Sequence, residues 1–209
     1  MQLIMSTSLS QFSNDKRSRS EAKMWRFVPL ALPDIILVEA PRFADARGWF
    51  RETYNRRIFA ENGIELDFVQ DNMSLSAAVG TVRGLHYQSE PFAQDKLVRV
   101  LHGSVLDVAV DIRKSSPTFG RHVAAEQSAQ NGRALLVPAG FAHGFITREP
   151  ETVVAYKVTA YYAPEHDHGI FWADRELGID WDIGSEVEPT LSPKDLHLPQ
   201  LEHADHLFR

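Results

Sequence analysis

The stretch Lys96–Ile112, KLVRVLHGSVLDVAVDI, has the two-residue period of β-strands along most of its length. In its second half one parity is entirely apolar, with Leu106, Val108, Val110 and Ile112, whereas the opposite parity carries Asp107 and Asp111 beside Val105 and Ala109. Successive side chains of a strand point to opposite faces of a sheet. The stretch therefore predicts two strands, and His102-Gly103 between them is typical of a hairpin turn.

Short runs of the same kind recur on both sides of this stretch, separated by turn residues at intervals of about ten residues. These runs are DIILVEA, GWFRETY, LDFVQDNMSLS, TVRGLHYQ, RHVAAEQS, RALLVP, HGFITR, TVVAYKVTAYY and GIFWAD. One short helix is expected over residues 55–63, NRRIFAENG, with Gly63 as its C-terminal cap. The spacing of the strands predicts an all-β sandwich or barrel with a few short helices.

Length and composition favour one globular domain. The chain has 209 residues, which is enough for a sizeable core and fewer than two domains usually need. Its net charge of −6 argues against nucleic acid as a partner, and cysteine is absent. No apolar run approaches a membrane span, and we expect a cytoplasmic protein. Residues 1–23 are polar and predict a disordered extension, with a single domain and a C-terminal tail over residues 24–209.

Two polar side chains share a parity with apolar neighbours. Lys96 lies on the same strand face as Val98 and Val100, and Tyr156 shares its face with valines of TVVAYKVTA. Lysine is rarely buried without a partner. Lys96 is therefore either a residue at the solvated rim or a functional group inside the fold, and Tyr156 is either a core tyrosine or a group that faces a cavity.

The segment Gly132–His143, GRALLVPAGFAH, has the glycine, proline, glycine and histidine of the second cupin motif. Upstream, Gly80 precedes His86 at the offset of the first cupin motif. The resemblance implies a cupin-type double-sheet jelly roll with an inner cavity. Metal-binding cupins place a second histidine two residues after the first, and here that position is Gln88. Glutamine is a poor transition-metal ligand, so we expect no metal.

A cavity lined by His86, Tyr156, Lys96 and His143 would suit proton abstraction beside a carbonyl group. Histidine titrates near neutral pH and serves as a general base, usually with a carboxylate on its other nitrogen. A phenol on the opposite wall returns a proton, and a cation stabilises the enolate oxygen. Neither a metal nor a cofactor is expected for this chemistry. Spacing alone does not establish that these residues converge.

A longer series of motifs resembles the dTDP-4-dehydrorhamnose 3,5-epimerase family. The motifs stand in order as FADARGWFRETY, FVQDNMSLS, RGLHYQ, QDKLVRVLHGSVLDVAVDIRKSSPTFG, LLVPAGFAHGF, AYKVTAYYAPEHDHGIFWAD, LGIDW and LSPKD. They cover residues 24–195, nearly the whole expected domain. The resemblance implies conversion of dTDP-4-dehydro-6-deoxy-D-glucose to dTDP-4-dehydro-L-rhamnose by inversion at C3 and C5, in dTDP-L-rhamnose biosynthesis.

The resemblance also implies catalytic roles. His86 matches the proton acceptor, Asp195 matches the carboxylate paired with it, and Tyr156 matches the proton donor on the opposite face. Lys96 matches the lysine near the C4 oxygen, and His143 lines the same pocket. The segment before Asp195 departs from the family pattern, so the position of that residue is less well defined by the sequence.

Further matches imply substrate-binding residues. They are Arg47, Glu52, Gln70, Asp71, Asn72, Arg83 and Lys194, together with Tyr162, which matches the aromatic residue that stacks on thymine. Asp167 stands where the family usually carries a glutamate. The family forms homodimers that exchange strands, so parts of one site are expected from both chains.

Three alternatives stay open. One is a 3- or 5-monoepimerase that acts on a related dTDP-4-keto-deoxysugar. Another is a metal-dependent cupin, such as an oxygenase or phosphosugar isomerase, and the third is a non-catalytic sugar-nucleotide binding module. Two structural interpretations accompany them: Asp174 is a structural carboxylate, and the terminal run with His197, His203 and His206 is a solvated tail.

One conflict remains inside RGLHYQ. Arg83 and His86 have opposite parity in a regular strand, yet the resemblance directs both to the ligand. We expect either a bulge or kink at Gly84, or an Arg83 side chain that reaches another part of the site.

Overall fold

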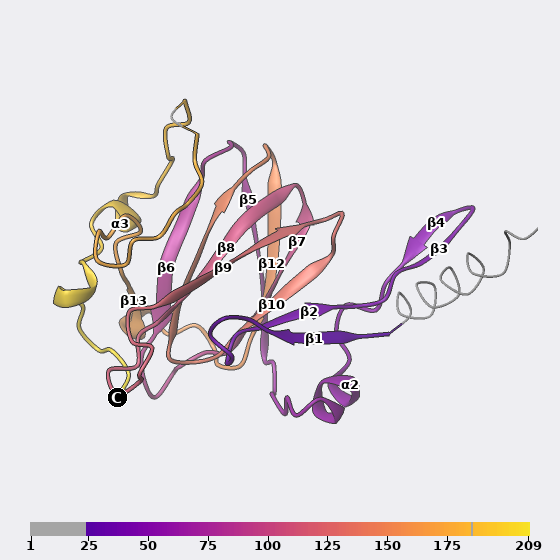
Figure 1. Cartoon of the computed structure of the whole chain (residues 1–209), viewed down its shortest axis with the longest axis horizontal. Helices are drawn as coiled ribbons and strands as arrows, with labels where there is room; N and C mark the ends of the chain where they lie inside the picture. The colour runs from indigo at the N-terminus through magenta and orange to yellow at the C-terminus, as the bar shows by residue number, and fades with distance from the viewer. Residues whose placement is uncertain (1–23, 185) are drawn as a thin grey trace, which may run out of the picture.

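The computed structural model describes residues 24–184 and 186–209, which form two antiparallel sheets packed face to face (Figure 1). This arrangement confirms the predicted cupin-like jelly roll. The predicted disordered extension, residues 1–23, lies outside the described residues. Within the described part of the chain, no helix has the length and hydropathy needed to cross a membrane.

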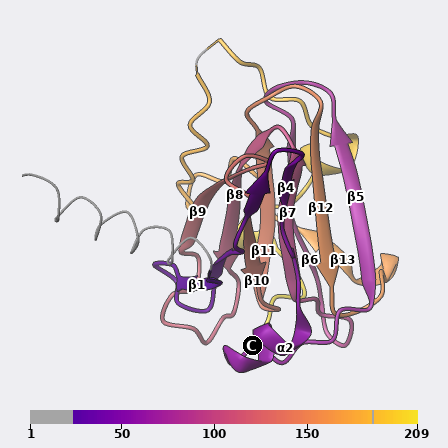
Figure 2. The same cartoon turned by 90° about the vertical axis from the view of Figure 1, so that its right-hand side faces the viewer.

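Each sheet combines strands from distant parts of the chain. The larger sheet has the order β1 (Arg26–Pro29), β2 (Ile36–Glu39), β10 (Arg133–Val137), β7 (Lys96–His102), β12 (Thr152–Val158) and β5 (Gln70–Ser76). The smaller sheet has the order β13 (Asp167–Gly169), β6 (Val82–Gln88), β11 (Phe141–Thr147), β8 (Ser104–Asp111) and β9 (His122–Ser128). Figure 2 shows β5 at the outer edge of the larger sheet, beside β12.

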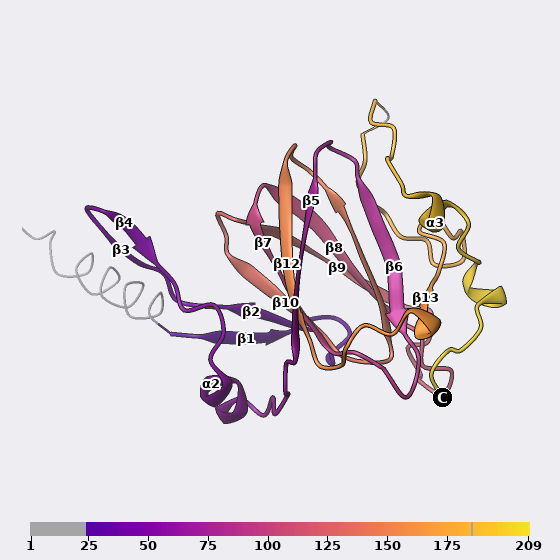
Figure 3. The ribbon, with the colours of Figure 1, turned by 180° about the vertical axis from the view of Figure 1, so that it is seen from behind.

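Smaller elements lie around the two sheets. They are the hairpin of β3 (Phe43–Asp45) and β4 (Gly48–Phe50), the helices α2 (Arg56–Glu61) and α3 (Pro193–Leu196), and the 3₁₀ turns η1 (Pro164–His166) and η2 (Leu201–His203). Figures 1 and 3 show that the β3–β4 hairpin extends away from the sheets, whereas α3 lies beside β6. The hairpin thus projects from the sandwich on the side away from α3.

The inner faces of the two sheets share an apolar core. Val98 of β7 and Val154 of β12 pack there against Phe145 of β11. Lys96 has the parity of Val98, and Tyr156 packs against this cluster. Both polar side chains therefore point between the sheets, as one of the two interpretations of the sequence required.

Strand β8 is buried on both faces. Leu106 and Val108 pack outward with Leu201 and Ala204 of the C-terminal segment, while Asp107 points between the sheets. The apolar face of this strand is therefore covered by the C-terminal segment, and its aspartate-bearing face belongs to the interior.

The predicted hairpin at His102-Gly103 is wrong. Strands β7 and β8 belong to different sheets, and the chain crosses from one sheet to the other at Gly103. Gly103 has φ +74°, a left-handed conformation that favours glycine. The local sequence located the turn correctly, but the partner of each strand is chosen by distant strands.

The C-terminal run is also corrected, because it is not simply a solvated tail. Leu201 and Ala204 are buried, and the Tyr87 hydroxyl donates to the carbonyl of Asp205 at 2.7 Å. Near the chain end, the Lys114 N–H donates to the carbonyl of Phe208 at 2.9 Å. Burial of each large apolar side chain contributes roughly 1.5–3 kcal/mol, so this segment is part of the folded domain.

Other local predictions have mixed outcomes. The expected helix is confirmed as α2, which Asn55 caps at its start and Gly63 follows at φ +80°. GIFWAD is not a strand: β13 ends at Gly169, and the chain then becomes irregular. Asp174 accepts hydrogen bonds from the N–H groups of Glu176 and Leu201, which fits the structural role predicted for it.

Candidate active site

A β-bulge at Gly84 resolves the parity conflict in RGLHYQ. On the neighbouring strand β11, His143 lies opposite His86, and Phe145 lies opposite Arg83. Two steps along β11 therefore match three steps along β6, which leaves one extra residue in β6. The insertion places Arg83 and His86 on the same side of the sheet, and both line one cavity.

Glycine at this point is required by the close approach of two backbones. Gly84 has φ +126°, and a Cβ on it would lie 2.5 Å from the Cα of Gly144 and 2.8 Å from the carbonyl oxygen of His143. Both the conformation and the space therefore exclude larger residues.

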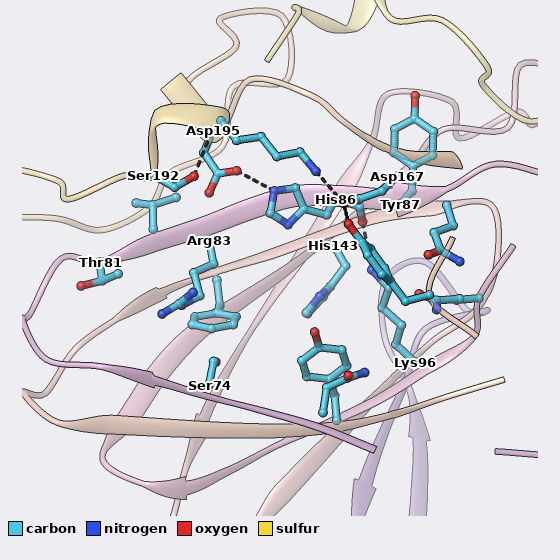
Figure 4. A pocket seen from close by; sticks show the side chains of 18 of the residues that line it. Ser74, Thr81, Arg83, His86, Tyr87, Lys96, His143, Asp167, Ser192 and Asp195 are labelled. Carbon is cyan, nitrogen blue, oxygen red and sulfur yellow. Dashed lines mark hydrogen bonds and ion pairs between the residues drawn. The ribbon is translucent and has the colours of Figure 1, made fainter. Parts of the chain in front are cut away.

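The cavity between the sheets has a volume of about 480 Å³. Figure 4 shows that Arg83 and His86 of β6, Lys96 of β7 and His143 of β11 point into it, with Asp195 above His86. Among the residues predicted for the site, it is lined by Gln70, Asn72, Arg83, His86, Lys96, His143, Tyr156, Tyr162, Asp167, Lys194 and Asp195. All four predicted catalytic residues therefore meet at one place, as does most of the predicted binding set.

His86 and Asp195 form a close pair. The Nε2 atom of His86 lies 2.6 Å from Oδ1 of the buried Asp195, which is on α3. Burial alone would raise the pKa of Asp195. Hydrogen bonds to its carboxylate from the side chains of His86 and Ser192 and from the Gly84 N–H outweigh this effect and lower the pKa. The carboxylate is therefore ionised at neutral pH and orients the imidazole with its proton on Nε2. The lone pair on Nδ1 is then available for a proton from substrate.

Lys96 provides a buried cation beside this pair. Its Nζ donates to the backbone carbonyl of His86 at 3.1 Å. Burial lowers the pKa of Lys96 to about 8, and the charges of Asp167 and Asp107 partly oppose that shift. The amine is therefore mostly protonated at neutral pH and titrates in the mildly alkaline range.

Tyr156 lies on β12 in the wall formed by the larger sheet, across the cavity from β6. Burial raises the pKa of its phenol, while the nearby charge of Arg83 acts in the opposite direction. The phenol therefore keeps its proton at neutral pH, as a proton donor requires.

The sequence-based prediction missed a second histidine–aspartate pair. Nε2 of His143 lies 2.5 Å from Oδ1 of Asp107, and the Gln127 amide donates to Oδ2 of the same carboxylate at 2.9 Å. All three side chains are buried. The signal in the sequence was an aspartate in the middle of an apolar strand, but its partner became visible only in the fold.

Asp167 connects two further groups at the mouth of the cavity. Its Oδ2 atom accepts hydrogen bonds from the Tyr162 hydroxyl at 3.0 Å and from the Lys194 amine at 2.6 Å. The hydrogen bond to Asp167 raises the pKa of the Tyr162 phenol. The shorter arm of aspartate thus still reaches both side chains.

Three predicted binding residues do not line the cavity of their own chain. Arg47 is at the turn of the β3–β4 hairpin with its side chain 90% exposed and paired with Asp45. Glu52 accepts a hydrogen bond from Asn55, and Asp71 pairs with Lys157 on the opposite face of β5 from the cavity. The alternation of strand faces explains Asp71, because its neighbours Gln70 and Asn72 both line the cavity.

Gln88, at the position of the second metal ligand in metal cupins, has its amide engaged by backbone groups of two loops. Across residues 24–184 and 186–209, no three or more His, Cys, Asp or Glu residues are grouped so that they could hold a metal ion.

Known proteins of similar sequence share one description. Residues 29–203 match the protein-family model described as dTDP-4-dehydrorhamnose 3,5-epimerase. The chain is 50% identical over 175 residues to the dTDP-4-dehydrorhamnose 3,5-epimerase of Sinorhizobium fredii, covering 84% of this chain and 89% of the relative. The Pseudomonas aeruginosa enzyme of the same name is 52% identical over 167 residues, covering 79% of this chain and 90% of the relative.

A solved structure is similar over almost the same region. It is a dTDP-6-deoxy-D-glucose-3,5-epimerase from Legionella pneumophila in complex with dTDP-4-keto-L-rhamnose. It superposes with a TM-score of 0.85 at 42% identity and covers 89% of this chain and 98% of the solved chain.

Proposed function

Because the chain belongs to the dTDP-4-dehydrorhamnose 3,5-epimerase family, we propose a specific role in epimerisation for each polar group of its cavity. The enzyme converts dTDP-4-dehydro-6-deoxy-D-glucose to dTDP-4-dehydro-L-rhamnose, in dTDP-L-rhamnose biosynthesis. Both inverted carbons, C3 and C5, flank the C4 ketone, so loss of either proton gives an enolate.

His86 is the general base. Its Nε2 proton is held by Asp195, so Nδ1 accepts the proton from C3 or C5. Asp195 also stabilises the imidazolium that forms. The observation that carries the proposal is this 2.6 Å pair in the same cavity as Tyr156 and Lys96.

Lys96 and Tyr156 complete the reaction. The Lys96 ammonium stabilises negative charge on the C4 oxygen, where its effect is strong because the site is buried. Tyr156 donates a proton to the face opposite His86, which inverts the carbon. His143, held by Asp107, contributes a further polar group to the wall that carries His86.

The remaining cavity residues bind the nucleotide part of the substrate. Lys194 and Arg83 supply cations for the diphosphate, and Tyr162 offers an aromatic face for thymine. Gln70, Asn72 and Asp167 lie along the same surface. In this arrangement the reacting sugar lies against His86, and the base lies near Tyr162.

We also propose a homodimer in which the β3–β4 hairpin of one protomer reaches the cavity of its partner. The hairpin extends from the body and exposes Phe43, Trp49 and Phe50. Exposed aromatic side chains on an extended arm favour a protein interface. The hairpin would bring Arg47 to the partner's cavity, and the segment just after it would bring Glu52. Neither residue lines the cavity of its own protomer. A cytoplasmic location is proposed with this function, because nucleotide sugars are made and used there.

Incubation with dTDP-4-dehydro-6-deoxy-D-glucose in deuterated water tests the activity. Proton NMR of the product should show loss of the proton signals at both C3 and C5, because deuterium from the solvent replaces these protons. Deuterium at one carbon only would indicate a monoepimerase, and no exchange at either carbon would contradict catalysis of this reaction. Loss of activity on chelation, with recovery on adding metal, would instead support a metal-dependent cupin.

A further inference from the structure

Gln88 connects strand β6 to two loops at once. Its Nε2 group donates to the carbonyl of Phe92 at 2.7 Å and to the carbonyl of Tyr161 at 3.2 Å. Its Oε1 atom accepts from the N–H of Ala163 at 2.8 Å. The side chain is only 4% exposed, so these backbone groups depend on the amide rather than on water.

Two of these contacts lie on either side of Tyr162. Gln88 holds the carbonyl of the preceding residue, Tyr161, and the N–H of the following residue, Ala163. The N–H of Tyr162 itself donates to Oε1 of Gln70 at 3.0 Å. Two glutamine side chains, from β6 and β5, therefore hold three consecutive backbone positions.

The Tyr162 side chain is much less constrained by packing than its backbone. It is 56% exposed at the cavity mouth, where its hydroxyl meets Asp167. A ring that packs on little else owes its position to the backbone that carries it. Holding that backbone in advance lowers the ordering entropy that ligand binding would otherwise cost.

We propose that Gln88 is a positioning residue for nucleotide recognition, acting through the backbone on both sides of Tyr162. This proposal rests on the proposed function, in which Tyr162 stacks on the base. It also gives a physical reason for glutamine at the position where metal cupins carry a ligand, because the amide is used as a clamp between loops.

The clamp needs an amide. Methionine has a similar length but neither donates nor accepts a comparable hydrogen bond. Glutamate keeps the shape and can accept from Ala163, but it places a carboxylate opposite the carbonyl oxygens of Phe92 and Tyr161. Both variants are therefore expected to release the Tyr162 loop.

A double-mutant cycle on the full-length enzyme tests the proposal, with dTDP binding measured by calorimetry. Tyr162→Ala and Gln88→Met should each weaken binding by about tenfold, the scale of one lost base-stacking contact. The double variant should bind about as weakly as Tyr162→Ala alone, because Gln88 acts through the tyrosine. Gln88→Met should raise KM with kcat nearly unchanged, and the exposed Gln200→Met should match the wild type.

Additive effects in the cycle, or a Gln88→Met variant with unchanged affinity, would overturn the positioning role while leaving the proposed function intact. Unchanged affinity in Tyr162→Ala would overturn both the stacking and the clamp, but deuterium exchange at C3 and C5 would still report the activity separately. Thermal unfolding shows whether Gln88→Met is folded. If it is not, Gln88→Glu takes its place in the same cycle with the same expected result.

Discussion

At the scale of single residues, the site is built from pairs in which one side chain sets the state of another. Asp195 fixes the proton of His86 on Nε2, and Asp107 does the same for His143. Burial raises the pKa of Tyr156, so the phenol keeps its proton, and lowers the pKa of Lys96 to about 8. These effects give the states that the proposed base, acid and cation need at neutral pH.

Asp195→Asn tests the first pair. The amide keeps the size of the side chain but cannot stabilise the imidazolium, so kcat should fall roughly 10²–10⁴-fold. Binding of dTDP should change little, because the nucleotide lies near Tyr162 in the proposed arrangement. Steady-state kinetics and calorimetry measure the two quantities, and a variant with wild-type kcat would contradict the role of Asp195.

The pH dependence tests Lys96. Its ammonium form is the active one, and its pKa is lowered to about 8. The value of kcat/KM should therefore fall as pH rises through about 8, rather than near the ordinary pKa of lysine. Lys96→Arg should retain less activity but lose this alkaline decline, since arginine stays charged. An identical decline in both proteins would assign it to another group.

At the scale of elements, the bulge in β6 decides what the strand presents to the cavity. It brings Arg83 and His86 to one face and turns Leu85 into the outer core. It also directs the Gly84 N–H to Asp195. One inserted residue thus brings the proposed base, its carboxylate partner and the Arg83 cation to one cavity.

Gly84→Ala should disturb this element. The added methyl group would meet the backbone of β11, and φ +126° is unfavourable for alanine. We expect a loss of roughly 2–5 kcal/mol in the free energy of unfolding, from overpacking and backbone strain together. Urea unfolding provides the measurement. Gly178→Ala, at φ +57° with open space around it, is the matched control and should lose only about 1–2 kcal/mol.

At the scale of the whole molecule, the cavity of one protomer is lined by the predicted catalytic residues but not by three of the predicted binding residues. Arg47 lies at the end of an extended hairpin, and Glu52 follows shortly after it. The proposed site shared between protomers would account for the exposed apolar arm and for the positions of Arg47 and Glu52.

Subunit complementation tests the shared site. Arg47→Ala and His86→Ala proteins should each be nearly inactive at low substrate concentration. When they are unfolded and refolded together, mixed dimers should regain activity, because one cavity then combines an intact His86 with an intact Arg47 from the partner. No recovery, although mixed dimers form by native mass spectrometry, would place Arg47 and His86 in the same protomer's site.

The sequence by itself determined the strand period, the positions of most turns and the helix at α2, because these depend on neighbouring residues. It also indicated His86, Lys96, Tyr156 and Asp195, since their motifs stand in a specific order. Tertiary structure decided the rest. Only pairing with β11 placed the bulge that aligns Arg83 with His86, and only packing between distant strands joined Asp107 to His143. The separation of β7 and β8 into two sheets and the burial of the C-terminal segment have the same cause: hydrogen bonds and apolar contacts between segments far apart in the chain, which no local pattern specifies.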